Sequence, residues 1–404
     1  MKTLLALSIL TAALLGITCG ALFGADTAPR VTVKDGKVYR DGQVYRGIGV
    51  NYCDLFQELI ANGDDKRTLN GLRFLGEKKI PFVRFWACGF WPSDWDLYFK
   101  DKGEWFRRMD LVVQTAEKAG VGLIPDLFWN TADYPQFAGE FQDQWGNPKS
   151  KTHEFMRAYI KEMVTRYKAS PAIWGWEFAN EVNLNCDLPN GMEFLGQDIP
   201  ALKHKLAKDP RNLWTHQMAQ VAFEAFADEV RKHDQVRFVT TGNSLPRGCA
   251  LHIGNKMEPR WGDDNHEEAF EAFKWFNPPA LDMVSVHFYG DAPEKLKYAG
   301  GQGIEYSVAA LKEFATKLNR PLFLGEFAGA ASDDLKAKFA EYQKQILDAV
   351  LAQKVDLSAY WVFDYTADRK GTGLVRRDNE YAWVLDQIVE YNAKIAQQLA
   401  AEKP

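Results

Sequence analysis

Short apolar runs and longer helix-like stretches alternate along most of the chain. The apolar runs have the length of buried strands, and each precedes a stretch long enough for a helix. The predicted strands are residues 46–51, 80–86, 121–127, 173–179, 236–241, 281–287, 321–326 and 358–363. The predicted helices, in the same order, are residues 66–78, 104–119, 152–167, 214–233, 267–276, 305–318, 334–352 and 381–399. The pattern therefore predicts eight successive β-then-α units.

This alternation predicts an α/β fold, in which helices cover a parallel sheet. Eight units in 404 residues predict a closed (β/α)₈ TIM barrel. The alternative, an open doubly wound sheet, usually carries a glycine-rich phosphate-binding turn after its first strand. The turn in this chain is Asn51-Tyr52-Cys53-Asp54, which has no glycine. We therefore expect a single (β/α)₈ domain over residues 25–404.

The connections between these elements differ in kind. Two Asp-Gly pairs, at 35–36 and 41–42, separate short apolar runs ahead of the barrel. Asp-Gly is a strong turn signal, so a short N-terminal β-hairpin is predicted. Two connections, 182–213 and 243–266, are much longer than the others. Both follow strands, so we expect them to form walls of a site at the C-terminal face of the barrel.

The N-terminus resembles an export signal. Lys2 precedes an apolar stretch over residues 4–15, and small residues continue to Ala25. The stretch is too short to span a membrane and is typical of a secretory signal peptide. We expect residues 1–24 to be this signal and the protein to be secreted or periplasmic. A lipoprotein anchored at Cys19 is the alternative, although Thr18 is a poor residue before such a cleavage site.

Composition and charge exclude some classes of function. The chain is 46% hydrophobic and 25% charged, as globular proteins are. Its formal net charge is −5, so the excess of basic residues that is typical of nucleic-acid-binding proteins is missing. The histidines mostly lack the spacing of metal ligands, so we expect no metal and no cofactor. No second apolar run approaches membrane length, and we expect a monomer without a membrane span.

Four cysteines follow the predicted signal peptide: Cys53, Cys88, Cys186 and Cys249. An even count in an exported chain permits two disulfides. Cys53 and Cys88 follow neighbouring predicted strands, as do Cys186 and Cys249, so these are the two predicted pairs. The alternative is four free thiols, because a core of this size needs no cross-links.

Two glutamates close apolar runs that are predicted to be buried strands. Glu181 ends the run 173–181, and Glu326 ends the run 321–326. Burying a carboxylate is costly unless the group is paired or used. In a (β/α)₈ barrel the reactive residues lie at the C-terminal ends of the strands. Two carboxylates there are the equipment for cutting a glycosidic bond, in which one protonates the leaving oxygen and the other attacks or activates water.

Further polar and aromatic residues occupy the ends of the other predicted strands. They are Asn51, Arg84, Trp129, Asn130, Asn180, His287, Tyr289 and Trp361. Three motifs stand out among them in chain order: Asn180-Glu181, His287-Phe288-Tyr289 and Gly325-Glu326-Phe327. On alternating βα units, this set resembles glycoside hydrolase family 5, the cellulase and mannanase family of retaining (β/α)₈ enzymes. The resemblance extends from about residue 38 to residue 361.

The resemblance implies roles for the central residues. Glu181 would be the general acid/base, and Glu326 would be the nucleophile. Asn180 would hold the 2-hydroxyl of the substrate, and Tyr289 would orient Glu326. Arg84 would lie beneath both carboxylates, where its charge favours the ionised nucleophile.

The surrounding residues would contact the sugar. The resemblance implies that His287 borders the glycosidic oxygen and that Trp361 is the platform under the sugar in subsite −1. Trp129, Asn130 and Asn51 are expected to bind substrate. Glu177 is expected to be a buried partner of Arg84 rather than a catalytic group. Four tryptophans are expected either to line subsites or to pack loops: Trp91, Trp95, Trp129 and Trp145.

The end of the third predicted strand bears on the substrate. Many cellulases end this strand with Asp-Trp-His, whereas residues 126–130 read Asp-Leu-Phe-Trp-Asn. The mannanase branch of the family often has Asn and Trp there, and residues 170–173 also resemble mannanases. The resemblance therefore favours a secreted retaining endo-β-1,4-mannanase. The alternatives are an endo-β-1,4-glucanase, a transglycosylase that uses the same intermediate, and a non-catalytic carbohydrate-binding barrel.

Overall fold

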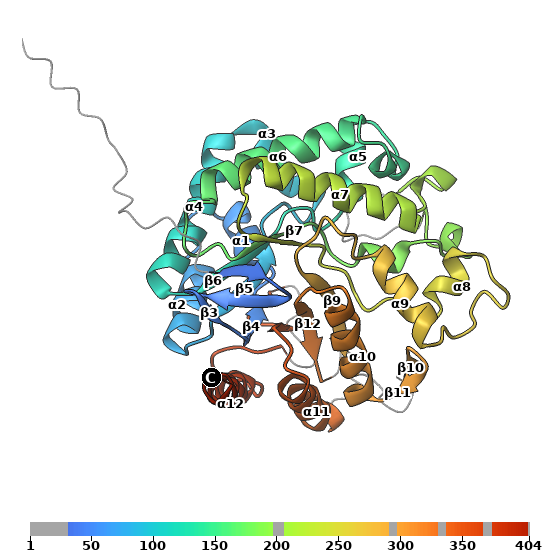
Figure 1. Ribbon diagram of the computed structural model, residues 1–404. Helices are drawn as coiled ribbons and strands as arrows, with labels where there is room; N and C mark the ends of the chain where they lie inside the picture. Colours follow the sequence, from blue (N-terminus) through green and yellow to red (C-terminus); the bar gives the residue numbers. More distant parts are fainter. Residues whose placement is uncertain (1–30, 197–205, 291–296, 330–336, 367–373, 403–404) are drawn as a thin grey trace, which may run out of the picture.

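Eight parallel strands form the centre of the fold (Figure 1). A computed structural model describes residues 31–196, 206–290, 297–329, 337–366 and 374–402. The strands are β4 (Gly47–Asn51), β5 (Phe82–Trp86), β6 (Gly122–Asp126), β7 (Gly175–Glu177), β8 (Phe238–Thr240), β9 (Val284–Tyr289), β12 (Leu322–Ala328) and β13 (Leu357–Tyr360). Their order is β8-β7-β6-β5-β4-β13-β12-β9. The predicted signal peptide and Cys19 lie outside the described residues.

The seam between β8 and β9 is joined by individual hydrogen bonds rather than by a ladder. The amide of Asp282 donates to the carbonyl of Val239 at 3.1 Å. The Thr240 hydroxyl donates to the carbonyl of Met283, also at 3.1 Å. These bonds bring the two edge strands together, so the predicted (β/α)₈ barrel is confirmed.

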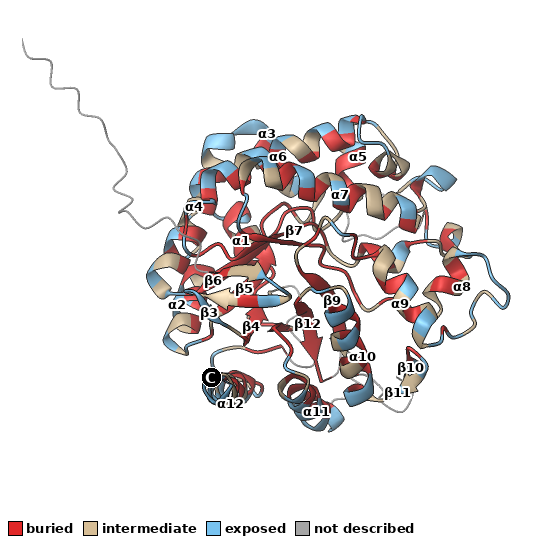
Figure 2. Cartoon of the chain, in the orientation of Figure 1, coloured by how far each residue is buried: buried red, intermediate tan, exposed pale blue. Residues whose placement is uncertain are grey.

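Helices surround the barrel, and each turns a buried face inward (Figure 2). The long ones are α2 (Arg67–Glu77), α4 (Lys102–Ala119), α6 (Lys151–Tyr167), α7 (His216–His233), α9 (His266–Trp275), α10 (Ile304–Lys317), α11 (Phe339–Ala352) and α12 (Trp383–Ala401). They correspond to the eight predicted helices. Side-chain caps fix several first turns, because Asp101, Ser150 and Thr215 accept backbone N–H bonds. Four shorter helices were not predicted: α1 (Leu55–Ala61), α3 (Trp95–Lys100), α5 (Asp133–Phe137) and α8 (Ala250–Gly254).

A small antiparallel sheet precedes the barrel and extends the predicted hairpin to three strands. These are β1 (Val31–Lys34), β2 (Lys37–Arg40) and β3 (Gln43–Val44). Both Asp-Gly turns have positive φ at both residues, as tight hairpin turns require. Val31 and Val38 pack against Phe82, Phe323 and Leu357 near the starts of barrel strands. The sheet therefore covers the N-terminal face of the barrel, opposite to the strand ends that carry the predicted site.

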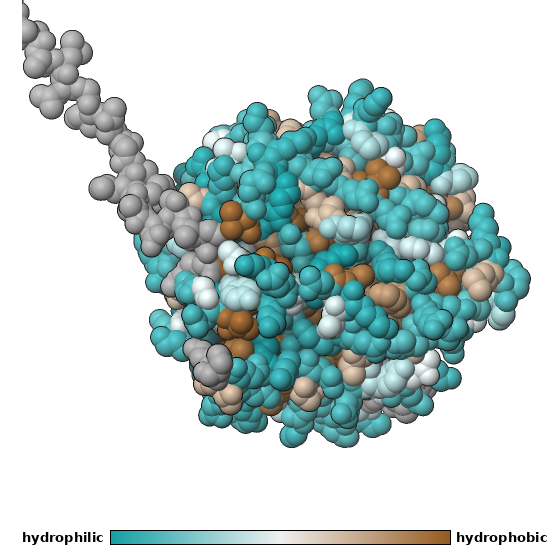
Figure 3. All heavy atoms as spheres, in the orientation of Figure 1, coloured by the Kyte–Doolittle hydropathy of each residue, from teal (hydrophilic) through white to brown (hydrophobic). Residues whose placement is uncertain are grey.

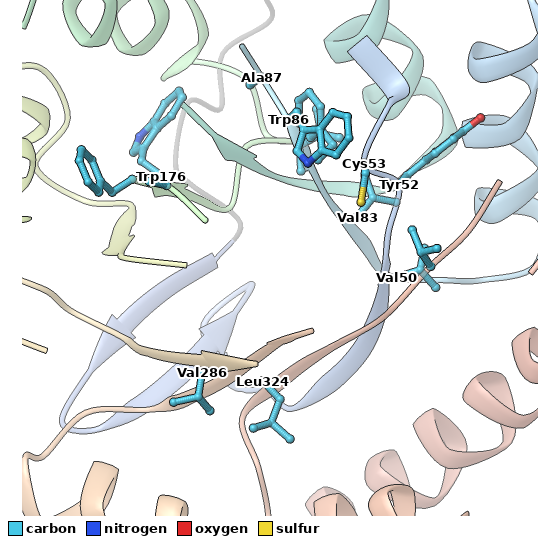
Figure 4. Packing of buried hydrophobic residues seen from close by; sticks show 14 of the residues in the cluster. Val50, Tyr52, Cys53, Val83, Trp86, Ala87, Trp176, Val286 and Leu324 are labelled. Atoms are coloured by element: carbon cyan, nitrogen blue, oxygen red, sulfur yellow. The ribbon is translucent and has the colours of Figure 1, made fainter. Parts of the chain in front are cut away.

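The barrel interior changes character from one end to the other. Its N-terminal part is apolar, with residues such as Phe82, Ile124, Phe238, Met283 and Phe323. Its C-terminal part is polar and includes Asn51, Arg84, Asp126, Glu177, Thr240, His287 and Glu326, all buried. Other side chains on the strands join the larger core, and Figure 4 shows Val50, Val83, Val286 and Leu324 among them. Alternation along most of the strands thus separates the helix-facing core from the barrel interior.

The surface is mainly polar on the face that Figure 3 presents, with small scattered apolar areas. Among the described residues, no helix has both the length and the apolar character needed to cross a membrane.

The four described cysteines are free thiols, so both predicted disulfide pairs were wrong. Cys53 and Cys88 are fully buried in the hydrophobic core. The Cys186 thiol instead donates to the carbonyl of Val182 at 3.5 Å. Burial raises the pKa of the Cys53, Cys88 and Cys186 thiols. Positions that follow neighbouring strands do not ensure that two side chains face each other.

We predict that all four cysteines react with a thiol-specific alkylating agent in the denatured, unreduced protein. In the native protein the three buried thiols should react much more slowly than Cys249, which is partly exposed. Peptide mapping by mass spectrometry measures both. A disulfide-linked peptide pair without prior reduction would contradict the structure.

Candidate active site

One buried arginine connects the residues at the C-terminal end of the barrel. The Arg84 guanidinium donates from Nε to Glu177 Oε1 at 2.5 Å and from Nη1 to Glu326 Oε1 at 2.8 Å. It also donates to Asn51 Oδ1 at 3.0 Å and to Asn180 Oδ1 at 2.9 Å. Burial alone would lower the pKa of Arg84, but the neighbouring carboxylates raise it. A single permanent cation therefore holds side chains from β4, β7, β12 and the turn after β7.

Glu326 is brought into the barrel by an irregularity in β12. The register of β12 against β9 shifts between Leu324 and Glu326. With regular alternation Glu326 would face the helices, because Leu324 does. The bulge instead places Glu326 beside Arg84, and such bulges commonly re-aim a side chain next to a site. The preceding Gly325 lies against His287, since a Cβ at Gly325 would come within 3.1 Å of the His287 ring.

The second oxygen of Glu326 accepts a hydrogen bond from the Tyr289 hydroxyl. Burial raises the pKa of Tyr289, and the charge of Glu326 raises it further. Tyr289 therefore keeps its proton and acts as a donor. With Arg84 on one oxygen and Tyr289 on the other, the carboxylate plane of Glu326 is fixed.

Glu181 lies at the rim of the same site. Its backbone is in the left-handed region with φ of 52°, which is uncommon and strained for a residue with a side chain. His287 Nδ1 lies 2.9 Å from Glu181 Oε1 and 3.5 Å from Glu326 Oε1. One oxygen of Glu181 and one of Glu326 lie within 4.8 Å of each other. The Glu181 side chain is 30% exposed, whereas that of Glu326 is 4% exposed.

Opposing effects act on the pKa of Glu181. Burial raises it, but the hydrogen bond and the charge of His287 lower it, as does a hydrogen bond from Ser244. The net result is a pKa below the ordinary value of a glutamate. Ser244 is itself held by Asn183, whose amide donates to its carbonyl at 2.9 Å. The connections after β7 and β8 therefore meet beside Glu181.

Aromatic side chains form a wall next to the carboxylates. The rings of Trp129 and Trp361 are nearly parallel, with 14° between their planes and 6.3 Å between centroids. Trp129 also covers Arg84, whose Cζ lies 4.9 Å from the ring centroid. A cavity of about 310 Å³ opens here, and its lining residues are Phe90, Trp129, Asn130, Asn180, Glu181, Leu184 and Asn185.

The structure brings together most of the predicted site residues, with some corrections. Glu177 is a buried partner of Arg84, as expected. Asn51, predicted to bind substrate, is fully buried, donates to the carbonyl of Gly325 and accepts from Arg84. Trp95 and Trp145 are fully buried and pack loops instead of lining subsites. Asn130 lines the cavity, and its amide donates to Asp133 at 3.0 Å.

Several residues at the site were missed by sequence reasoning. Asp126 lies behind Arg84, with its Oδ2 3.7 Å from Nη2. Phe90, Leu184 and Asn185 line the cavity, and Ser244 contacts Glu181. Asp126 could have been found from its place at the end of a predicted strand. The others lie in connections, where the chain direction is not predictable from a local pattern.

Two clusters among the described residues have donor atoms close enough to share a cation. The first is Glu181, His287 and Glu326. There, hydrogen bonds from Arg84 and Tyr289 already use the two oxygens of Glu326. The second is His252, Asp264 and Glu268. In that cluster the Asp264 oxygens accept backbone amides at the start of α8 and Glu268 caps α9, so these groups have structural partners.

Comparison with known proteins identifies the family. The family model for cellulase (glycosyl hydrolase family 5) matches residues 53–367, most of the chain. The chain belongs to glycosyl hydrolase family 5. The resemblance carried by the three sequence motifs is thereby confirmed, and the matched region contains every strand of the barrel except β4.

Curated relatives match shorter segments of this family 5 chain. A probable mannan endo-1,4-β-mannosidase A from Aspergillus flavus is 32% identical over 155 residues, which cover 32% of this chain and 40% of the relative. Mannan endo-1,4-β-mannosidase F from Aspergillus fumigatus is 35% identical over 97 residues, which cover 22% of each chain. The chain thus spans less than half the length of these relatives.

Solved structures resemble the whole fold. A family 5 mannosidase from Rhizomucor miehei has a TM-score of 0.63 at 14% identity, with 93% of this chain and all of that chain covered. An exo-β-1,4-mannosidase from an Opitutaceae bacterium has a TM-score of 0.58 at 16% identity, with 92% and 64% covered. At these identities the likeness shows the shared barrel fold.

The contact between His287 and Glu181 generates a prediction about pKa. In His287→Ala, burial remains while the hydrogen bond and charge that lower the pKa are lost, so the pKa of Glu181 should rise. Titration of carboxyl-labelled glutamates by ¹³C NMR measures it.

The matched control is Tyr289→Phe, which removes a hydrogen bond to Glu326 and none to Glu181. It should move the pKa of Glu181 much less than His287→Ala does. An unchanged or lower pKa in His287→Ala would contradict the assigned contact.

Proposed function

We propose that the protein is a secreted retaining β-glycosidase that cuts within β-1,4-linked mannan. The observation that carries this proposal is the arrangement of Glu181 and Glu326. Their nearest oxygens lie within 4.8 Å. Retaining enzymes have carboxyl groups about 5–5.5 Å apart, whereas inverting enzymes need about 6.5–9.5 Å to admit a water molecule. The short separation favours direct attack by one carboxylate.

Glu326 is the better nucleophile of the two. It is held by Arg84 and Tyr289 and is nearly inaccessible to water, so its attacking oxygen is fixed. In the first step it bonds to the anomeric carbon while the glycosidic bond breaks. Glu181, at the open rim, gives its proton to the leaving oxygen. In the second step Glu181 takes a proton from water, which attacks the anomeric carbon and releases Glu326.

The charges in the site change with the step. In the free protein the His287 contact lowers the pKa of Glu181. A sugar in the cavity excludes water from the exposed part of Glu181, and loss of water favours the protonated acid. Once Glu326 is esterified its negative charge is gone, so Glu181 ionises more readily and acts as the base.

The remaining residues supply contacts to the sugar. Asn180 accepts from Arg84 through Oδ1, which leaves its amide nitrogen to donate to a 2-hydroxyl. The parallel rings of Trp129 and Trp361 are flat apolar surfaces suited to the C–H faces of sugars. Trp129 also shields Arg84 from water, which strengthens the ion pair with Glu326.

Mannan is favoured over cellulose by two observations. The curated relatives described above are named mannan endo-1,4-β-mannosidases. Trp129 and Asn130 stand where many cellulases of the family carry a histidine, and both line the cavity. An endo-β-1,4-glucanase remains the second candidate, since the family model is that of cellulases. The apolar N-terminus, Lys2 to Ala25, supports secretion.

The test is hydrolysis of a panel of polymeric mannan, glucan and xylan, followed by sizing of the products. We expect the highest rate on mannan, with oligosaccharides as early products. A site built for one epimer leaves polar groups unpaired with the other, so kcat/KM on mannopentaose should exceed that on cellopentaose by about 10²-fold or more.

Glu326→Ala is the control for the site. It should lower kcat by several orders of magnitude, and added azide should restore turnover with an inverted product. A preference for glucan, or release of single sugars only, would reject the endo-mannanase assignment and leave the retaining mechanism in place. Near-full activity of Glu326→Ala would reject the mechanism.

A further inference from the structure

Two buried carboxyl groups lie side by side behind the proposed nucleophile. Asp126 on β6 and Glu177 on β7 are paired residues in the parallel ladder. Neither side chain is exposed to solvent. The two have no part in the retaining mechanism itself, and they contact Arg84 at Nη2 and Nε, whereas Glu326 contacts Nη1.

The hydrogen bonds of this pair are incomplete if both groups are ionised. Asp126 Oδ1 accepts the amide of Phe128 at 3.1 Å, and Glu177 Oε1 accepts from Arg84. The other two oxygens, Asp126 Oδ2 and Glu177 Oε2, are buried and have no donor. A buried acceptor without a donor is costly, and a buried unpaired charge is more so. A proton on either carboxyl turns the contact between the two side chains into a hydrogen bond.

The charge count leads to the same conclusion. Among the described residues, Arg84 is the one cation in contact with three carboxylates: Glu177, Asp126 and Glu326. Two further titratable groups, the Cys88 thiol and the Tyr134 phenol, interact electrostatically with Asp126. Burial raises the pKa of both groups, so both stay neutral and add no charge. Burial and the charge of Glu177 also raise the pKa of Asp126.

We propose that Asp126 and Glu177 share a single proton and act as positioning residues that set the charge facing Arg84. With one proton on the pair, Arg84 is balanced by one negative charge behind it and by Glu326 in front. Loss of that proton would draw Arg84 towards Asp126 and add negative charge near Glu326. The extra charge would favour protonation of the nucleophile. This inference rests on the proposed function for its catalytic consequence only.

Amide substitutions test the shared proton through activity. Asp126→Asn keeps a neutral donor towards Glu177 and an acceptor for Phe128, so kcat/KM at pH 6 should stay within about threefold of the wild type. Asp126→Ala removes the donor and should cost about tenfold or more. In Glu177→Gln the negative charge must lie on Asp126, which is 3.7 Å from Arg84 rather than 2.5 Å. The weaker ion pair should lower kcat/KM about tenfold.

The double variant Asp126→Asn with Glu177→Gln has no charge behind Arg84. Its loss should exceed the product of the two single losses. On the alkaline side of the pH profile, Asp126→Asn should lose activity at higher pH than the wild type. If Asp126→Asn loses as much as Glu177→Gln, or if its pH profile is unchanged, the shared proton is rejected.

Thermal unfolding tests the same proton without substrate. A carboxyl whose folded pKa is raised binds its proton in the folded state after the unfolded chain has lost it. Stability therefore falls as pH rises towards the folded pKa. Asp126→Asn has no such carboxyl, so its stability should not fall in this way. The melting temperature of Asp126→Asn minus that of the wild type should therefore increase by several degrees between pH 5 and pH 9.

Asp234→Asn is the matched control. Asp234 is also buried, but a hydrogen bond from Trp176 and contacts with Arg237 lower its pKa despite burial. It is ionised throughout this pH range, so Asp234→Asn should be destabilised by a constant amount. A constant difference for Asp126→Asn as well would overturn the proposal. If no glycan is hydrolysed but the Asp126→Asn difference rises with pH, the proposed function fails and the shared proton stands.

Discussion

The buried guanidinium of Arg84 is the constraint on which the site depends. A cation with no exposed surface must be fully paired, because removing it from water without partners is prohibitive. Its partners come from β4, β7, β12 and the turn after β7. These strands must therefore keep a fixed register, or a charge in the interior loses its partner. The same bonds that satisfy Arg84 orient Glu326 and Asn180 for chemistry.

The rest of the barrel is organised around that cation. The small sheet at the N-terminal face closes the end of the barrel with apolar residues, so water is excluded from below. Polar side chains are confined to the other end, where they pair with one another. The apolar part of the barrel interior has a low dielectric constant, which strengthens the electrostatic interactions of Arg84. Trp129 completes the enclosure from the cleft side. Precise placement of the nucleophile then follows from packing as much as from hydrogen bonds.

Much of this arrangement was predictable from sequence because it follows local patterns. Strand and helix positions follow from alternating apolar runs, and the motif residues Asn180, Glu181, His287, Tyr289 and Glu326 follow from strand ends. The bulge that turns Glu326 inward was not predictable, since it depends on how β12 packs against β9. The burial of Asn51 was missed for a similar reason, because a polar residue at a strand end can face a partner or a ligand. Disulfide pairing failed because it depends on side-chain directions that strand order does not specify.

The central claim is that Glu326, held by Arg84 and Tyr289, attacks the sugar and forms a covalent intermediate. A 2-deoxy-2-fluoroglycosyl fluoride tests it directly, because the fluorine at C2 slows breakdown of the intermediate while the fluoride leaving group lets it form. The protein should be incubated with the manno and gluco epimers separately and analysed by intact mass and peptide mapping. The account predicts the addition of one fluoroglycosyl unit, located on Glu326. A label on any other residue, or an inverted hydrolysis product without a label, would contradict it.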